Sequence, residues 1–113
     1  DLRRFCELQD RPMPVYASPH TMADLRRMFY YAFDGQHTYR NYVRPEPHEI
    51  LGPFTLGSVG IAPAEVPHGK ILVNGYVLSR NGRNLAAYFS DCHHVPPAVI
   101  ESIRGIPVLM IDA

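Results

Sequence analysis

The 113-residue sequence lacks any excess of charge and any long apolar run. Eleven basic residues balance eleven acidic ones, so no overall field attracts nucleic acid or an anionic membrane surface. No apolar stretch approaches the roughly 20 residues that cross a bilayer, and no secretory signal stands at the start. We therefore expect a cytoplasmic protein without membrane attachment, and the composition argues against nucleic acid as its partner.

Cysteine is scarce. Cys6 and Cys92 are too few for a disulfide framework, which favours reduced thiols. Cys6 shares an apolar helical stripe with Leu2 and Phe5 and is predicted to lie in the core. Cys92 directly follows Asp91, so it could support a metal site, although packing is the favoured interpretation. Neither cysteine has a basic neighbour in sequence, which argues against a thiol nucleophile.

Familiar catalytic signatures are also missing. The sequence has no glycine-rich phosphate loop, no Ser–His–Asp spacing and no Cys-x-x-Cys pair. Apolar residues make up 46% of it, enough for a globular core, which excludes disorder. It opens in the middle of a predicted helix without Met, so we expect a piece cut from a larger protein.

The pattern of apolar residues predicts a mixed α and β chain. Thr21 and Asp24 have the spacing of a capping box at the start of a helix, and residues 36–47 predict a polar loop long enough to be functional. Helices are expected over 2–9, 22–33 and 98–103, and strands over 15–17, 48–51, 54–56, 61–66, 71–78, 85–89 and 108–111, the last of them buried.

Residues 71–78 and 85–89 are the strongest predicted strands, and Asn81-Gly82 predicts a tight turn between them. Residues 71–78 are apolar on both faces, which implies layers above and below. Asn74-Gly75 could form a turn within this run, but a continuous strand is favoured.

His68 and Asp91 are the candidate site residues. His68 stands in a predicted loop before residues 71–78, and Asp91 follows residues 85–89, so the hairpin places both at one end. Imidazole and carboxylate suit zinc, manganese or iron, and a carboxylate can bridge two ions. A surface histidine and a capping carboxylate are the alternatives, and two ligands alone do not make a site.

Three further histidines are predicted to lie in solvent, and two more, His93 and His94, are left open. His93 and His94 adjoin Asp91, but adjacent side chains in an extended segment diverge, so at most one could reach a shared ion. No role is assigned to this pair. The remaining histidines, each expected to be solvated, are His20, His37 and His48.

The order of these segments resembles the metallo-β-lactamase superfamily, particularly the branch that includes the phosphoribosyl cyclic phosphodiesterase of phosphonate breakdown. Six segments in the right order carry the resemblance. They are Asp1-Leu2-Arg3-Arg4-Phe5, Met13-Pro14-Val15-Tyr16-Ala17, the stretch from Thr21 through Phe29-Tyr30-Tyr31-Ala32-Phe33, Pro67-His68-Gly69, the stretch from Gly75-Tyr76 to Tyr88-Phe89-Ser90-Asp91, and Val108-Leu109-Met110-Ile111-Asp112-Ala113.

The resemblance implies an α+β fold that forms part of a four-layer αββα sandwich. It implies His68 as a terminal metal ligand and Asp91 as the catalytic carboxylate shared by two divalent ions (zinc, manganese or iron), with a bridging hydroxide as the nucleophile. Asp112 could brace this site from outside the ligand set, or could simply cap its strand.

The family's His-x-His-x-Asp-His segment should precede Asp1, and its last metal histidine should follow Ala113. We therefore expect residues 1–113 to be a single partial domain that lacks both flanks and is inactive alone. An incomplete sandwich exposes strand edges and apolar faces, which invites association such as a homodimer.

The sequence leaves two hypotheses for the function, one an enzyme and the other a binding protein. The first is a metal-dependent hydrolase, specifically a phosphodiesterase acting on a small phosphorylated substrate such as a nucleotide or sugar phosphate, with substrate contacts from residues 30–44. The second is a non-catalytic ligand- or protein-binding module in which His68 and Asp91 are structural.

Overall fold

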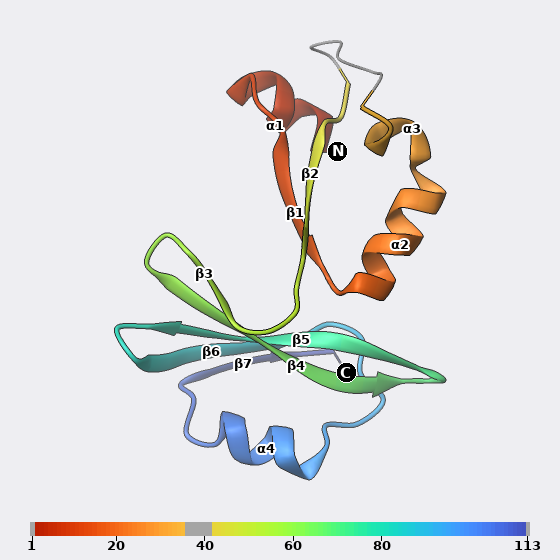
Figure 1. The fold of residues 1–113 in the computed structure, drawn as a ribbon. Helices are drawn as coiled ribbons and strands as arrows, with labels where there is room; N and C mark the ends of the chain where they lie inside the picture. Colours follow the sequence, from red (N-terminus) through yellow and green to blue (C-terminus); the bar gives the residue numbers. More distant parts are fainter. Residues whose placement is uncertain (1, 36–41, 113) are drawn as a thin grey trace. The chain divides into compact units, whose positions relative to one another are not determined.

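A computed structural model describes residues 2–35 and 42–112 (Figure 1). The chain divides into two compact units, Asp1–Leu51 and Gly52–Ala113, each of which is described by itself. Both units combine helices with a sheet, which confirms the predicted α+β class. Within the described residues, no helix is long and apolar enough to cross a membrane.

The first unit is a pair of parallel strands with helices packed on it. Strands β1 and β2 pair from Met13 opposite Pro45 to Ala17 opposite Glu49, and α2 packs against both. Its elements are α1 (Leu2–Gln9), β1 (Met13–Ala17), α2 (Pro19–Met28), α3 (Tyr30–Phe33) and β2 (Pro45–Glu49).

Helix α2 begins earlier than the spacing of Thr21 and Asp24 predicts, so that prediction was wrong. The Ser18 hydroxyl accepts the backbone N–H of Thr21 at 3.2 Å and caps the helix. Pro19 occupies the first turn, where its missing N–H costs nothing. A serine followed by proline is thus the stronger start signal here.

The predicted loop over 36–47 is wrong at its end, because β2 already begins at Pro45. Pro45 and Pro47 of β2 have no backbone N–H to donate. Proline is tolerated in an edge strand, because the N–H groups on its outer side have no strand to pair with. The Met13 N–H donates to the Arg44 carbonyl at 2.8 Å, at the start of this pairing. The rest of the predicted loop, residues 36–41 with His37, lies outside the described residues.

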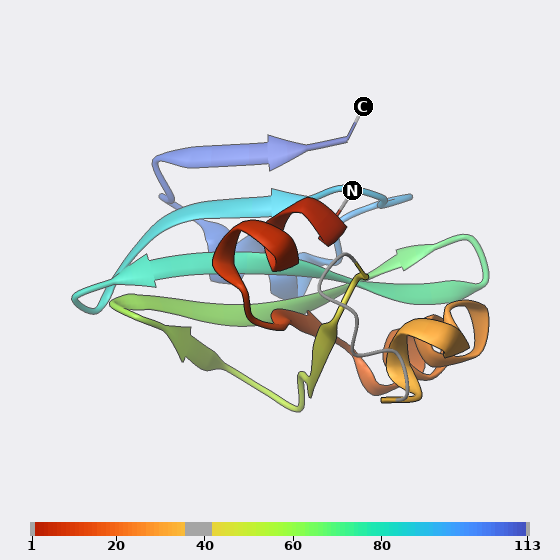
Figure 2. The ribbon, with the colours of Figure 1, turned by 90° about the horizontal axis from the view of Figure 1, so that it is seen from above.

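The second unit is a five-stranded sheet in the order β3-β4-β5-β6-β7 (Figure 2). The first four strands pair antiparallel, and β7 joins β6 in parallel through the crossover helix α4. The elements are β3 (Phe54–Leu56), β4 (Val59–His68), β5 (Ile71–Arg80), β6 (Arg83–Phe89), α4 (Pro97–Ile103) and β7 (Val108–Ile111).

The hairpin of β5 and β6 is the one predicted. Asn81 and Gly82 both have positive φ, 51° and 72°, as a two-residue hairpin turn that follows the strand twist requires. Strand β5 runs without a break through Asn74-Gly75, which confirms the continuous strand over the alternative turn.

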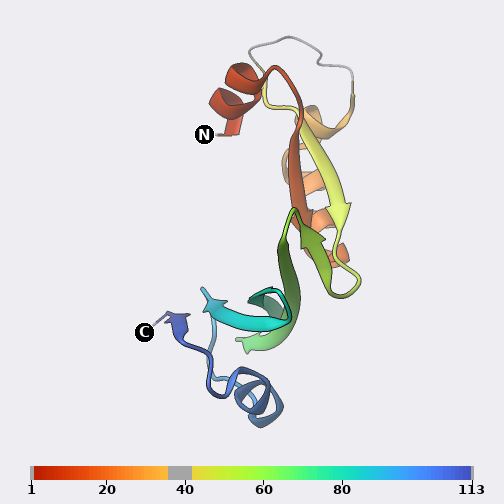
Figure 3. The same ribbon diagram turned by 90° about the vertical axis from the view of Figure 1, so that its left-hand side faces the viewer.

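Helix α4 covers one face of this sheet (Figure 3). The buried cluster beneath it comprises Val66, Val77, Ala87 and Phe89, with Val99 and Ile103 of α4 among the partly buried residues packed against it. Burial on both faces of β5 was predicted, but its first residues, Ile71 and Leu72, are 52% and 62% exposed. The apolar run therefore extends beyond the part of the strand that packs.

Strand β7 has the predicted position, but the prediction that it is buried was wrong. All four of its residues are exposed. Within the described residues it pairs only with β6, so its other edge is open and its apolar side chains are only partly covered.

Gly75 makes room for the ring of Phe89, because a methyl group at Gly75 would overlap that ring. We expect Gly75→Ala to lower the free energy of unfolding by about 1–3 kcal/mol, as overpacking does. Gly52→Ala is the control, since nothing lies within 4 Å of its added carbon; it should change stability by less than about 1 kcal/mol. Equal effects in urea titrations would contradict the close fit.

Candidate functional site

The candidate metal ligands lie at one end of the five-stranded sheet. Strands β4 and β6 are both antiparallel to β5, and β7 is parallel to β6. The carboxyl ends of β4, β6 and β7 therefore share one end of the sheet, seen at the right in Figures 1 and 2. They carry His68, Asp91 and Asp112 respectively.

His68 is the last residue of β4 and is exposed. Sequence reasoning placed it in a loop before a strand, and this was wrong. It pairs with Ile71, and a two-residue turn of Gly69 and Lys70 closes the hairpin, with Gly69 at φ 61°. The hairpin therefore extends through His68 and fixes its backbone within the sheet.

Asp91 lies two residues past the buried end of β6 at Phe89 and is exposed. Two backbone hydrogen bonds hold the chain on either side of Asp91 to neighbouring strands. The Asp112 N–H donates to the Phe89 carbonyl at 2.9 Å, and the His93 N–H donates to the Pro67 carbonyl at 2.8 Å. The chain after β6 thus passes back to the end of β4, one residue before His68.

Both cysteines are packing residues, as the favoured interpretation held. Cys92 is half-buried against the core under α4, which holds the segment between Asp91 and His93 against the sheet. Cys6 is completely buried, and its sulfur accepts the Arg44 N–H at 3.5 Å. His93 and His94 are exposed, with ring centroids 6.0 Å apart.

The donor set at this sheet end fits a divalent metal by chemistry but is incomplete. Imidazole and carboxylate are suitable ligands. Across residues 2–35 and 42–112, however, no three His, Cys, Asp or Glu side chains converge closely enough to hold an ion. The structure thus brings the two predicted ligands to one sheet end without assembling a full coordination sphere.

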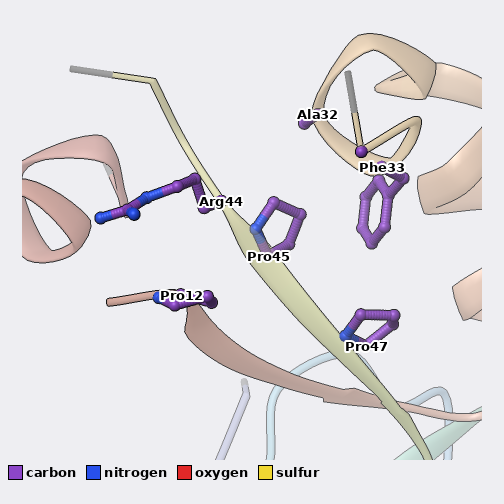
Figure 4. Close-up of a pocket in the computed structure, with 7 residues that line it drawn as sticks. Pro12, Ala32, Phe33, Arg44, Pro45 and Pro47 are labelled. Atoms are coloured by element: carbon purple, nitrogen blue, oxygen red, sulfur yellow. The ribbon is translucent and has the colours of Figure 1, made fainter. Parts of the chain in front are cut away.

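The first unit contains a separate pocket of about 340 Å³, within the size range of small-molecule sites. Phe33 faces Pro45 and Pro47 across it (Figure 4). The sequence analysis did not identify these two prolines as pocket residues. Their alternation in β2, which places both on one face of the strand, was the available signal. The pocket is lined by Pro12, Ala32, Phe33, Gly35, Arg44, Pro45 and Pro47.

Arg44 does not supply this pocket with a free positive charge. Its guanidinium turns away from the prolines (Figure 4), donates to the Cys6 carbonyl at 3.2 Å and lies 3.6 Å from an Asp10 carboxylate oxygen. Among the described lining residues, the side chains other than that of Arg44 are uncharged.

The prediction that His48 is simply solvated was wrong. Its ring stacks on Tyr16 with centroids 4.7 Å apart, and its Nε2 lies 2.9 Å from an oxygen of Glu46. Another histidine that was predicted to be solvated, His20, is exposed and lies 3.7 Å from Asp24. Both histidines are thus accounted for by neighbours within the first unit.

Comparison with known proteins identifies the family. A family model described as a beta-lactamase superfamily domain matches residues 1–113. The chain belongs to the metallo-β-lactamase superfamily. A search of curated protein sequences gives no match.

Two crystal structures are similar to this member of the metallo-β-lactamase superfamily. A new diphosphatase from the PhnP family has a TM-score of 0.67 and 28% identity, covering 86% of this chain and 33% of its own. The metallo-β-lactamase fold protein YhfI from Bacillus subtilis has a TM-score of 0.65 and 11% identity, covering 95% and 39%; this likeness shows the fold alone. The chain thus spans about a third of the first protein and about two fifths of the second.

The two thiols of this superfamily member should differ in reactivity, because access controls labelling. In the native protein we expect Ellman's reagent to modify Cys92 before Cys6, which should react only on unfolding. Single Cys92→Ala and Cys6→Ala variants identify which thiol accounts for each phase. Equal native-state rates for the two thiols would contradict the burial of Cys6.

Proposed function

We propose that the protein containing this chain is a metal-dependent phosphodiesterase and that residues 1–113 are the central part of its catalytic domain. The main support is the shared sheet end, where the ends of β4 and β6 carry His68 and Asp91. Similarity to a PhnP-family diphosphatase over 86% of the chain supports hydrolysis of a phosphorus–oxygen bond.

His68 would be a terminal ligand to one metal and Asp91 the carboxylate shared by two. When bound, two divalent ions (zinc, manganese or iron) would lower the pKa of a water and offset charge on the phosphoryl oxygens. The protein contributes fixed ligand positions. Hairpin pairing holds the backbone of His68, and the hydrogen bond between His93 and Pro67 holds the segment after Asp91 beside it.

Asp112 would act outside the ligand set, as a brace. Its backbone is tied to the Phe89 carbonyl, so its carboxylate starts from the same sheet end as Asp91. Carboxylates in this outer position orient metal ligands and raise their basicity. The Asp112 side chain is exposed and free to take this role.

The substrate would be a small phosphorylated molecule such as a nucleotide or sugar phosphate. The geometry gives no support to phosphate binding by Arg44, whose guanidinium is engaged by Cys6 and Asp10. Contacts from other residues of 30–44 remain part of the proposal. The alternative, a non-catalytic binding module, draws its support from the pocket beside Phe33.

Metal content and hydrolysis together test the proposal in the full-length protein purified without chelator. We expect bound divalent metal and cleavage of bis(4-nitrophenyl) phosphate, both lost in His68→Ala and Asp91→Ala. Asp112→Asn should cost about 10–100-fold in activity or metal affinity, as removal of an outer partner does.

His20→Ala is the matched control, because this exposed histidine belongs to the first unit; it should behave as wild type. Retention of metal and activity in both ligand variants would refute the assignment. Wild-type protein without metal or activity would favour the binding module.

A further inference from the structure

We propose that Lys70 binds the phosphoryl group of the substrate. This inference rests on the proposed phosphodiesterase function and names a positively charged substrate contact at the same sheet end. Lys70 stands two residues after His68, in the turn between β4 and β5, and its side chain is exposed.

The backbone of Lys70 is held in place. His68 and Ile71 are paired on either side of the turn, so Gly69 and Lys70 are its two central residues. Gly69 has φ 61°, which glycine adopts at little cost. A tight turn of this kind limits where the lysine side chain begins, although the four-carbon stem keeps its reach.

The other positive charges of the second unit are not available at this end. Arg80 and Arg83 flank the opposite turn, and the ten residues of β5 separate the two turns by roughly 30 Å at ~3.3 Å per residue. Arg104 is engaged by Glu101 on helix α4, with Nε 3.1 Å from its carboxylate, and this contact lowers the pKa of Glu101.

Lys70 is the only lysine in the sequence. Within residues 52–112 it is the one lysine or arginine at the end that carries His68, Asp91 and Asp112, and no ion pair there uses it. An ammonium group can donate charge-assisted hydrogen bonds to phosphoryl oxygens, in addition to the positive charge that the two proposed ions would supply. Lys70 would thereby favour anionic phosphate esters over neutral esters.

The test uses the full-length, metal-loaded protein. Lys70→Met should raise KM for bis(4-nitrophenyl) phosphate and the inhibition constant of inorganic phosphate by about 10- to 100-fold, the range for loss of a hydrogen bond to a charged group. The value of kcat and the metal content should stay near wild type. Lys70→Arg should recover most of the binding, and Arg80→Met, at the far turn, is the matched control.

Each outcome decides the inference separately from the proposed function. An active wild type with an unchanged Lys70→Met variant would overturn the role of Lys70 and leave the phosphodiesterase standing. Loss of metal in Lys70→Met would also overturn it, because the effect would then act through His68. If the wild type cleaves no phosphodiester, calorimetric titration with inorganic phosphate decides: weaker binding in Lys70→Met supports the contact, and equal or absent binding refutes it.

Discussion

The fit of the Phe89 ring over Gly75 fixes where the central hairpin ends. Phe89 is completely buried, and only a residue without a side chain leaves room for it on β5. The Phe89 carbonyl also accepts the N–H of Asp112, so the same residue ties β7 to β6. Since Asp91 follows two residues later, the packing of one aromatic ring sets the level at which both carboxylates leave the sheet.

Strand direction brings together two residues that lie far apart in the sequence. His68 and Asp91 are 23 positions apart, yet they share a sheet end because β4 and β6 run the same way on either side of β5. The hydrogen bond from the His93 N–H to the Pro67 carbonyl holds the segment after Asp91 beside the end of β4. The sheet thus brings the two proposed ligand positions to one end, although metal affinity needs a more complete set of ligands.

Much of this sheet could be predicted from the sequence, because its signals are local. Asn81-Gly82 identifies the turn through its positive φ values, and the apolar pattern identifies the paired strands. The position of His68 within β4 could not be predicted, since Pro67 and Gly69 on either side of it are typical of a loop. The exposure of β7 could not be predicted for a different reason. An apolar run predicts a buried strand, but the segment that would cover it need not lie nearby in the sequence.

The most direct test of the proposed metal site at this sheet end is paramagnetic broadening by Mn²⁺ in the full-length protein, observed in backbone amide spectra. Signals near His68, Asp91 and Asp112 should broaden first and together, while Arg80 and Arg83, roughly 30 Å away by the length of β5, should stay sharp. Broadening first at the Arg80–Arg83 turn, or none at the three strand ends while the ion binds elsewhere, would contradict a metal site built on this end of the sheet.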